Sequence, residues 1–169
     1  MLTAFPHHII AIGASAGGME EINAFFDHTP LDGVSYVIVQ HLSADFKSRM
    51  VELVARHSKL KVTEAENGME VKSNQVYLIP NDKFMTISQG RLLLTDKEKV
   101  KGPHLTINTF FNSLASDIGE KAICIVLSGL VLTVPTESKR LKKRAGLYWF
   151  VTRKQLNLAA CLLMRLLPG

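Results

Sequence analysis

The feature that most constrains the fold of this chain is an apolar run that ends in a turn of small residues. Residues 9–12 are isoleucine and alanine, and residues 13–18 are all glycine, alanine or serine. The apolar run is short and does not alternate with polar residues, which is typical of a strand buried on both faces of a parallel sheet. Open α/β sheets place their ligands and chemistry at the carboxyl ends of such strands. Ser15, which supplies the only hydroxyl group of the turn, is therefore a candidate functional residue.

The segments that follow alternate between helix and strand patterns. Apolar residues at helical spacing predict helices at Met19–Phe26, from Ser43 to about His57, and at Thr106–Ala115, with Thr106 as the N-cap of the last. Strands are predicted at Val34–Val39, Lys61–Ala65, Val76–Pro80 and Ala122–Leu127, and a β-hairpin at Phe84–Ser88 and Arg91–Leu94. This alternation predicts an α/β fold, a doubly wound and mostly parallel sheet in a Rossmann-like three-layer arrangement.

The composition is typical of a single globular domain. The chain has 169 residues, of which 47% are hydrophobic, and this is enough to bury a core. No apolar run reaches the length of a membrane span, and no signal-peptide pattern precedes the first strand. Cys124 and Cys161 are far apart in sequence, and Cys124 lies in an apolar run. Free thiols in a reducing, cytoplasmic setting are therefore favoured over a disulfide framework.

The formal net charge of +5 is distributed unevenly along the chain. From Leu130 to the end there are eight basic residues and one acid, Glu137, whereas twelve basic and fourteen acidic residues precede Leu130. A mildly acidic domain is thus followed by a strongly basic tail. Tails of this kind often bind nucleic acid or membranes.

His41 is the second candidate functional residue, because it follows directly on the predicted strand that ends near Gln40. Adjacent strand ends would bring His41 within reach of Ser15, as a nucleophile and its base require. The Ser15 turn could instead hold a phosphate, or be a tight turn without function. A dinucleotide site is disfavoured, because its fingerprint has glycine in place of Ser15 and an acid after the second strand. The other histidines lack metal-ligand spacing and are interpreted as structural or solvent-facing: His7, His8, His28, His57 and His104.

Five motifs in chain order carry a resemblance to a known family. They are Gly13-Ala14-Ser15-Ala16-Gly17-Gly18, Gln40-His41, Glu64-Ala65-Glu66-Asn67-Gly68, Tyr77-Leu78-Ile79-Pro80-Asn81-Asp82-Lys83 and Leu127-Ser128-Gly129. Together they resemble the catalytic domain of the CheB-type protein-glutamate methylesterases, which the chain matches over residues 8–129. The resemblance implies a doubly wound α/β fold, and neither a metal nor an organic cofactor.

The resemblance also implies an activity and the residues that perform it. The family hydrolyses glutamyl methyl esters and deamidates glutamines on chemotaxis receptors, in bacterial chemotaxis or related signalling. By resemblance, Ser15 is the nucleophile, His41 is the general base, and the backbone N–H groups of His41 and Leu130 form the oxyanion hole. The implied partners are methyl-accepting chemotaxis receptors and, by analogy with hybrid proteins that begin with this domain, a receptor methyltransferase; nucleic acid is not expected. Because the catalytic motif begins at once, we expect no receiver domain ahead of it.

The resemblance stops after Gly129. The family continues to an aspartate that completes a catalytic triad, but this chain reads Leu130-Val131-Leu132-Thr133, so the triad Asp expected near Thr133 is absent. A frameshift of one nucleotide would explain the change. Leu130–Thr133 can be encoded by CTG GTT CTG ACG, and one base restored in front gives ACT GGT TCT GAC G, which reads Thr-Gly-Ser-Asp. The same step permits family-like text further on, so residues 130–169 are predicted to be an aberrant tail that is translated out of frame.

The competing interpretation takes the tail as it is written. Lys139–Arg144 would then form a patch for nucleic acid or acidic lipid, and Leu156–Leu167 an amphipathic interfacial helix. With such a tail we expect no strands after Ala122–Leu127, an exposed sheet edge, and little activity, because losing the triad aspartate costs about four orders of magnitude in rate. The alternative function is an inactive α/β module that binds a receptor or a methyltransferase, and a nucleotide-binding module is a third.

Overall fold

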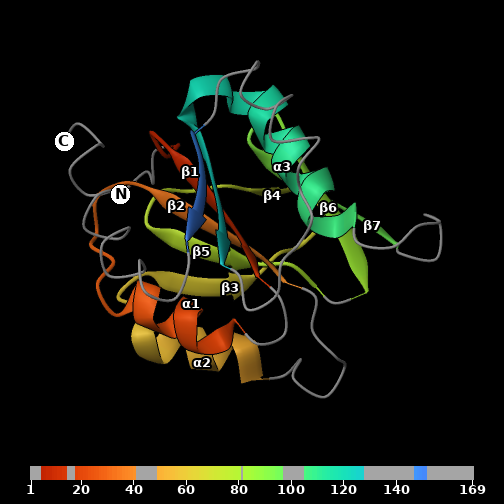
Figure 1. Ribbon diagram of the computed structural model, residues 1–169. Coiled ribbons are helices and arrows are strands. Elements are labelled where there is room, and N and C mark those ends of the chain that lie inside the picture. Colours follow the sequence, from red (N-terminus) through yellow and green to blue (C-terminus); the bar gives the residue numbers. More distant parts are fainter. Residues whose placement is uncertain are drawn as a thin grey trace.

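The computed structural model describes residues 5–14, 18–40, 49–80, 82–96, 105–127 and 147–151 (Figure 1). For Leu105 and residues 147–151 the description is limited to the backbone. Within these residues, no helix is both long and apolar enough to cross a membrane.

A parallel sheet of six strands forms the centre of the described chain. Its order is β3 (Lys61–Glu64), β5 (Gln75–Leu78), β2 (Ser35–Gln40), β1 (Ile9–Ala14), β8 (Ala122–Leu127) and β9 (Leu147–Val151). Every neighbouring pair is parallel. All residues of β1, β2 and β8 are buried, because layers cover both faces of these central strands. The predicted α/β fold with a mostly parallel sheet is confirmed.

Helices lie on both faces of this sheet, as a doubly wound fold requires (Figure 1). Helices α1 (Met19–Phe26) and α2 (Met50–His57) cover one face, and α3 (Leu105–Ile118) lies over the other, followed by a short 3₁₀ helix, Gly119–Lys121. Successive residues of β1 point to opposite faces. Ile10 and Ile12 therefore pack in the core under α1 and α2, and Ile9 and Ala11 pack in the core under α3.

A second, antiparallel sheet lies beside α3 and has the order β4 (Met69–Glu70), β7 (Arg91–Asp96) and β6 (Lys83–Ser88). Strands β6 and β7 are the predicted hairpin. Its two turn residues, Gln89 and Gly90, have φ of 52° and 70°, the left-handed conformation of a tight two-residue hairpin turn. Strand β4 was not predicted, because two residues are too short to show alternation.

Two details differ from the expectations, and one part of a prediction lies outside the described residues. Helix α2 ends at His57, as predicted, and the part of the predicted helix from Ser43 to Ser48 lies outside the described residues. Helix α3 begins at Leu105, so Thr106 lies in its first turn and not at the N-cap. The expectation that no strand follows Ala122–Leu127 is wrong, because β9 pairs with β8 over five residues. Its sequence Leu-Tyr-Trp-Phe-Val has high β propensity, and the edge of β8 offers unpaired backbone groups.

Candidate functional site

The carboxyl ends of three adjacent strands lie at the same level in the sheet. Ala14, the last residue of β1, pairs with Gln40 at the end of β2 on one side and with Leu127 at the end of β8 on the other. Neighbouring strands in a sheet are about 4.8 Å apart. The chain therefore leaves β1, β2 and β8 from three points side by side, at the edge where open α/β sheets place their chemistry.

The candidate catalytic residues follow these strand ends in the sequence. Ser15 comes directly after β1 and His41 directly after β2, and Leu130 and Thr133 come shortly after β8. All four lie outside the described residues. The roles given to them by resemblance therefore stay predictions. The described part of the site is the edge of the sheet formed by the carboxyl ends of β1, β2 and β8.

A close approach of α3 to β1 shapes this edge from one side. A Cβ atom at Gly13 would lie 2.7 Å from Ile107 Cγ2, 3.2 Å from Ile107 Cδ1 and 3.2 Å from Phe111 Cζ. Only glycine lets the helix come this near without displacing a side chain. Sequence reasoning gave Gly13 no role beyond the small-residue turn and did not single out Ile107. A glycine inside an otherwise β-branched strand was the available signal of a close backbone approach.

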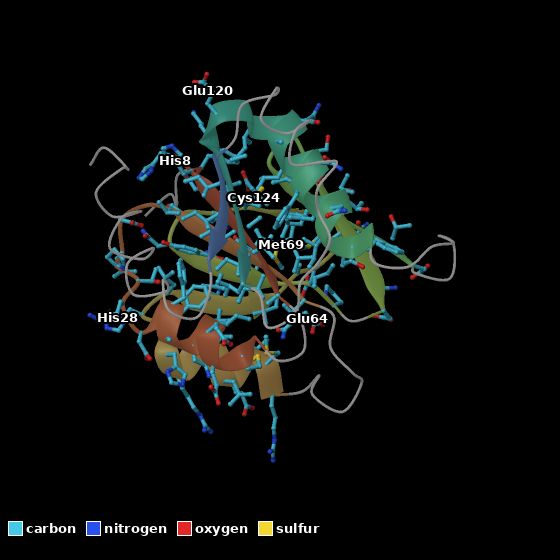
Figure 2. The ribbon with its side chains drawn as sticks, viewed as in Figure 1. His8, His28, Glu64, Met69, Glu120 and Cys124 are labelled. Carbon is cyan, nitrogen blue, oxygen red and sulfur yellow. The ribbon has the colours of Figure 1, made fainter. Side chains whose placement is uncertain are left out.

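The nearby thiol is not a competing nucleophile. Cys124 lies in the middle of β8, is a free cysteine and is 3% exposed. Burial raises its pKa to about 12, so the thiol stays protonated and unreactive at neutral pH. Figure 2 shows Cys124 inside the molecule, away from the surface.

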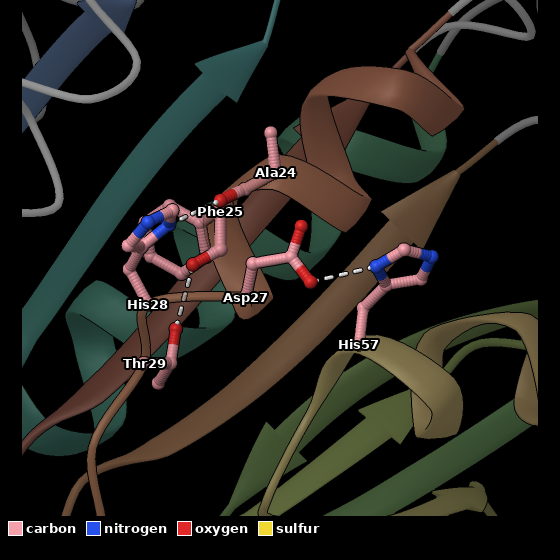
Figure 3. A network of polar contacts seen from close by, with 6 residues as sticks. All are labelled: Ala24, Phe25, Asp27, His28, Thr29 and His57. Carbon is pink, nitrogen blue, oxygen red and sulfur yellow. Dashed lines mark hydrogen bonds and ion pairs between the residues drawn. The ribbon is translucent and has the colours of Figure 1, made fainter.

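The described histidines make surface contacts away from this edge. Nδ1 of His28 lies 3.2 Å from the carbonyl oxygen of Ala24, at the end of α1, and Nδ1 of His57 lies 2.7 Å from Oδ1 of Asp27 (Figure 3). His7 and His8 contact each other before β1 begins. These positions agree with the prediction of structural or solvent-facing histidines; His104 lies outside the described residues. Among the residues that the structure describes, there is no group of three or more histidine, cysteine or acidic side chains placed to hold a metal ion.

Comparison with known proteins identifies the family to which the chain belongs. A model of the CheB methylesterase family matches residues 10–155, most of the chain. The chain belongs to the CheB methylesterase family. The match begins in β1, includes all three strand ends, and continues past Gly129 through β9.

Individual relatives agree with this family. The chain is 32% identical over 126 residues to protein-glutamate methylesterase/protein-glutamine glutaminase 1 of Xanthomonas campestris pv. campestris, an alignment covering 72% of this chain and 35% of that protein. It is 29% identical over 126 residues to the protein-glutamate methylesterase/protein-glutamine glutaminase of Salmonella typhimurium, covering 36% of it. This CheB-family chain thus spans about a third of the length of the curated relatives it matches.

A solved structure shows the same fold. The crystal structure of the Thermotoga maritima CheB methylesterase catalytic domain superimposes with a TM-score of 0.71 at 24% sequence identity. The similarity covers 83% of this chain and 77% of that one. The predicted resemblance to the CheB catalytic domain is confirmed at the level of family and fold.

Proposed function

We propose that this CheB-family chain is built as a serine hydrolase of glutamyl methyl esters and glutamine side chains on chemotaxis receptors. Ser15 is the nucleophile, His41 is the general base, and the backbone N–H groups of His41 and Leu130 stabilise the oxyanion. One observation carries the proposal: β1, β2 and β8 end at one level, with Ala14 paired to both neighbours. The segments that contain the three functional groups therefore start side by side. Family membership and the names of the relatives support the choice of reaction.

The proposed reaction is acyl transfer in two steps. Ser15 Oγ attacks the side-chain carbonyl carbon of the substrate while His41 takes its proton, and the oxyanion that forms accepts hydrogen bonds from backbone N–H groups. His41 then protonates the leaving group, which departs as methanol from an ester or as ammonia from an amide. Water, deprotonated by His41, then attacks the carbonyl carbon of the seryl ester, the bond from that carbon to Ser15 Oγ breaks, and His41 returns the proton to Oγ as the glutamate carboxylate leaves. No metal or organic cofactor enters these steps.

The tail determines how far this chemistry proceeds. No acid stands between Leu130 and Thr136, where the family's aspartate is expected, so the base lacks the aspartate that would orient it, and we expect a rate lower by about four orders of magnitude than that of an intact triad enzyme. Residues 8–129 are proposed as the incomplete catalytic domain and residues 130–169 as a segment translated out of frame. The DNA from codon 125 onward tests this: if no single insertion or deletion restores family-like text, the hypothesis is wrong. In the described part of this tail, strand β9 adds to the sheet.

The proposed setting follows from the cysteine chemistry. Cys124 is free and buried, which fits a reducing compartment, so the chain is proposed to act in the cytoplasm. The partners are the receptor itself and a receptor methyltransferase that forms the esters. No nucleic-acid partner is proposed.

Methanol release from a methylated receptor tests the function. Four proteins are compared: the chain itself and a chain in which the reading frame after Gly129 is restored, each with and without Ser15→Ala. We expect release by the frame-restored chain, loss of that release when Ser15→Ala is added, and release near the detection limit for the chain as written. Release by the chain as written at the frame-restored rate would contradict the damaged triad. Retention of release with Ser15→Ala would contradict the nucleophile.

The inactive binding module is tested by the same variants. If the chain as written changes receptor signalling, and Ser15→Ala leaves that effect unchanged, the effect does not depend on the nucleophile. Such a result would favour a non-catalytic module that binds the receptor or the methyltransferase.

A further inference from the structure

The contact between β1 and α3 lies next to the proposed nucleophile. Gly13 is the last but one residue of β1, two positions before Ser15. The side chain of Ile107, in the first turn of α3, occupies the space that a side chain at Gly13 would need. Phe111, one turn further along α3, contacts the same space and is 1% exposed. This contact joins two residues that are distant in sequence, directly before the carboxyl end of β1.

Helix α3 is fixed against sliding by polar contacts at its other end. The backbone N–H of Ile87 donates a hydrogen bond of 3.0 Å to Ser113 Oγ. The N–H groups of Gln89 and Gly90, in the turn of the β6–β7 hairpin, donate to the two carboxylate oxygens of Asp117 at 2.6 and 3.0 Å. Because the hairpin holds one end of α3, the helix presents Ile107 to β1 at a defined level.

We propose that Ile107 is a positioning residue for the carboxyl end of β1. Its side chain fills the volume left open by Gly13, and this packing sets the level at which β1 ends and the Ser15 turn begins. Ile107 itself touches neither substrate nor reacting atoms. It is partly buried at the margin of the core under α3 and acts through the backbone of β1. The catalytic consequence rests on the proposed function, in which that turn carries the nucleophile.

The chain contains a matched control for this residue. Ile118 is also an isoleucine of α3, is also partly buried, and packs at the margin of the same core, but at the far end of the helix. Ile107→Ala and Ile118→Ala therefore remove the same atoms from the same helix. A purely structural role predicts that the two variants change the reactivity of the Ser15 turn equally. The positioning role predicts that Ile107→Ala changes it and Ile118→Ala does not.

The readout is the alkylation rate of a thiol placed in the turn, which needs no intact triad. A full-length chain with Ser15→Cys and Cys161→Ser carries one introduced thiol, and the remaining thiol, Cys124, is buried and protonated. Its reaction with iodoacetamide is followed from pH 5 to pH 10 by mass spectrometry, alongside urea unfolding of each variant. The rate and its pH midpoint report the surroundings of the turn, because the thiolate is the reacting form.

We expect both alanine variants to lower the urea midpoint, and Ile107→Ala alone to change the alkylation rate at the turn, by roughly tenfold. Ile107→Val keeps the Cγ2 atom and should keep the parent rate. Gly13→Ala should perturb the turn because of its 2.7 Å contact, and the pair Gly13→Ala with Ile107→Ala should recover part of the loss, because the new methyl group enters the vacated space.

The positioning role and the proposed function are tested by different outcomes. Equal rates in the Ile107→Ala and Ile118→Ala backgrounds, or no recovery in the double variant, would overturn the positioning role. If Ile107→Ala does not fold, the double variant decides in its place: an alkylation rate no closer to the parent rate than that of Gly13→Ala alone would overturn the positioning role. A pH midpoint of the parent thiol at the ordinary thiol value of 9.0 would count against an oxyanion-stabilising turn, while leaving the comparison of the two isoleucines valid.

Discussion

Single residues set local shape in this chain through the space around their backbone. Gly68 and Gly90 both have left-handed backbones, with φ of 80° and 70°. An added Cβ at Gly68 meets nothing within 4 Å, whereas at Gly90 it would lie 2.6 Å from Phe5 Cε2. Both glycines therefore have a left-handed backbone, but only at Gly90 would an added Cβ meet a neighbouring side chain.

We predict that Gly90→Ala destabilises the chain more than Gly68→Ala does. Both variants place a side chain in a left-handed backbone, which costs on the order of 1 kcal/mol. Gly90→Ala must in addition displace Phe5, a half-exposed side chain that can partly move away. Urea unfolding of the two variants measures the difference. Equal losses in the free energy of unfolding would show that the Phe5 side chain moves aside without an energetic cost.

Elements are held together here by a few polar contacts between segments that are distant in sequence. The β6–β7 hairpin was predicted from two short runs joined by a Gln-Gly turn, and helix Met19–Phe26 has the predicted bounds. The attachment of the hairpin to α3 through Ser113 and Asp117 could not be predicted, because it depends on tertiary packing and leaves no periodic signal. The same is true of β4, whose two residues pair only because β7 lies beside them.

We predict that Asp117→Asn loosens the hairpin turn. The carboxylate accepts hydrogen bonds from two backbone N–H groups, and an amide offers only one oxygen for them, so the loss is about 1–2 kcal/mol. Amide hydrogen exchange at Gln89 and Gly90 should quicken. Glu120→Gln, at an exposed acid just after α3, is the control and should leave both amides unchanged. An unchanged exchange rate at these two amides in Asp117→Asn would mean that the turn keeps its conformation without the Asp117 carboxylate.

The whole molecule buries several weak acids in the interior of its sheet. Tyr36 of β2, Tyr77 of β5 and Cys124 of β8 are each less than 4% exposed, and burial is the main cause that raises the pKa of all three. For Cys124 the raised pKa is about 12, against an ordinary value of 9.0. A raised pKa in the folded state means that the unfolded chain loses these protons first as the pH rises.

We predict that the free energy of unfolding is insensitive to these groups below pH 9 and falls between about pH 9 and pH 12, because the ordinary pKa of the thiol is 9.0 and the raised one about 12. Urea unfolding at fixed ionic strength across this range measures the slope. Cys124→Ala should lower the slope near pH 9 and leave the later contribution of the tyrosines. A stability that rises through this range would contradict the burial of these groups.

The sequence alone determined the kinds of elements and the identity of the family. Short apolar runs, small-residue turns and helical spacing are local properties, so strand Ala122–Leu127, helix Met19–Phe26 and the motifs around Ser15 and His41 can be found without coordinates. The order of the strands, which places the ends of β1, β2 and β8 at one level, was decided by tertiary structure, since any buried strand could have paired with any other. The same holds for the addition of β9 to the sheet and for the packing of Ile107 over Gly13. Both arise because backbone edges and side-chain volumes from distant segments must fit one another, a condition that only the folded chain imposes.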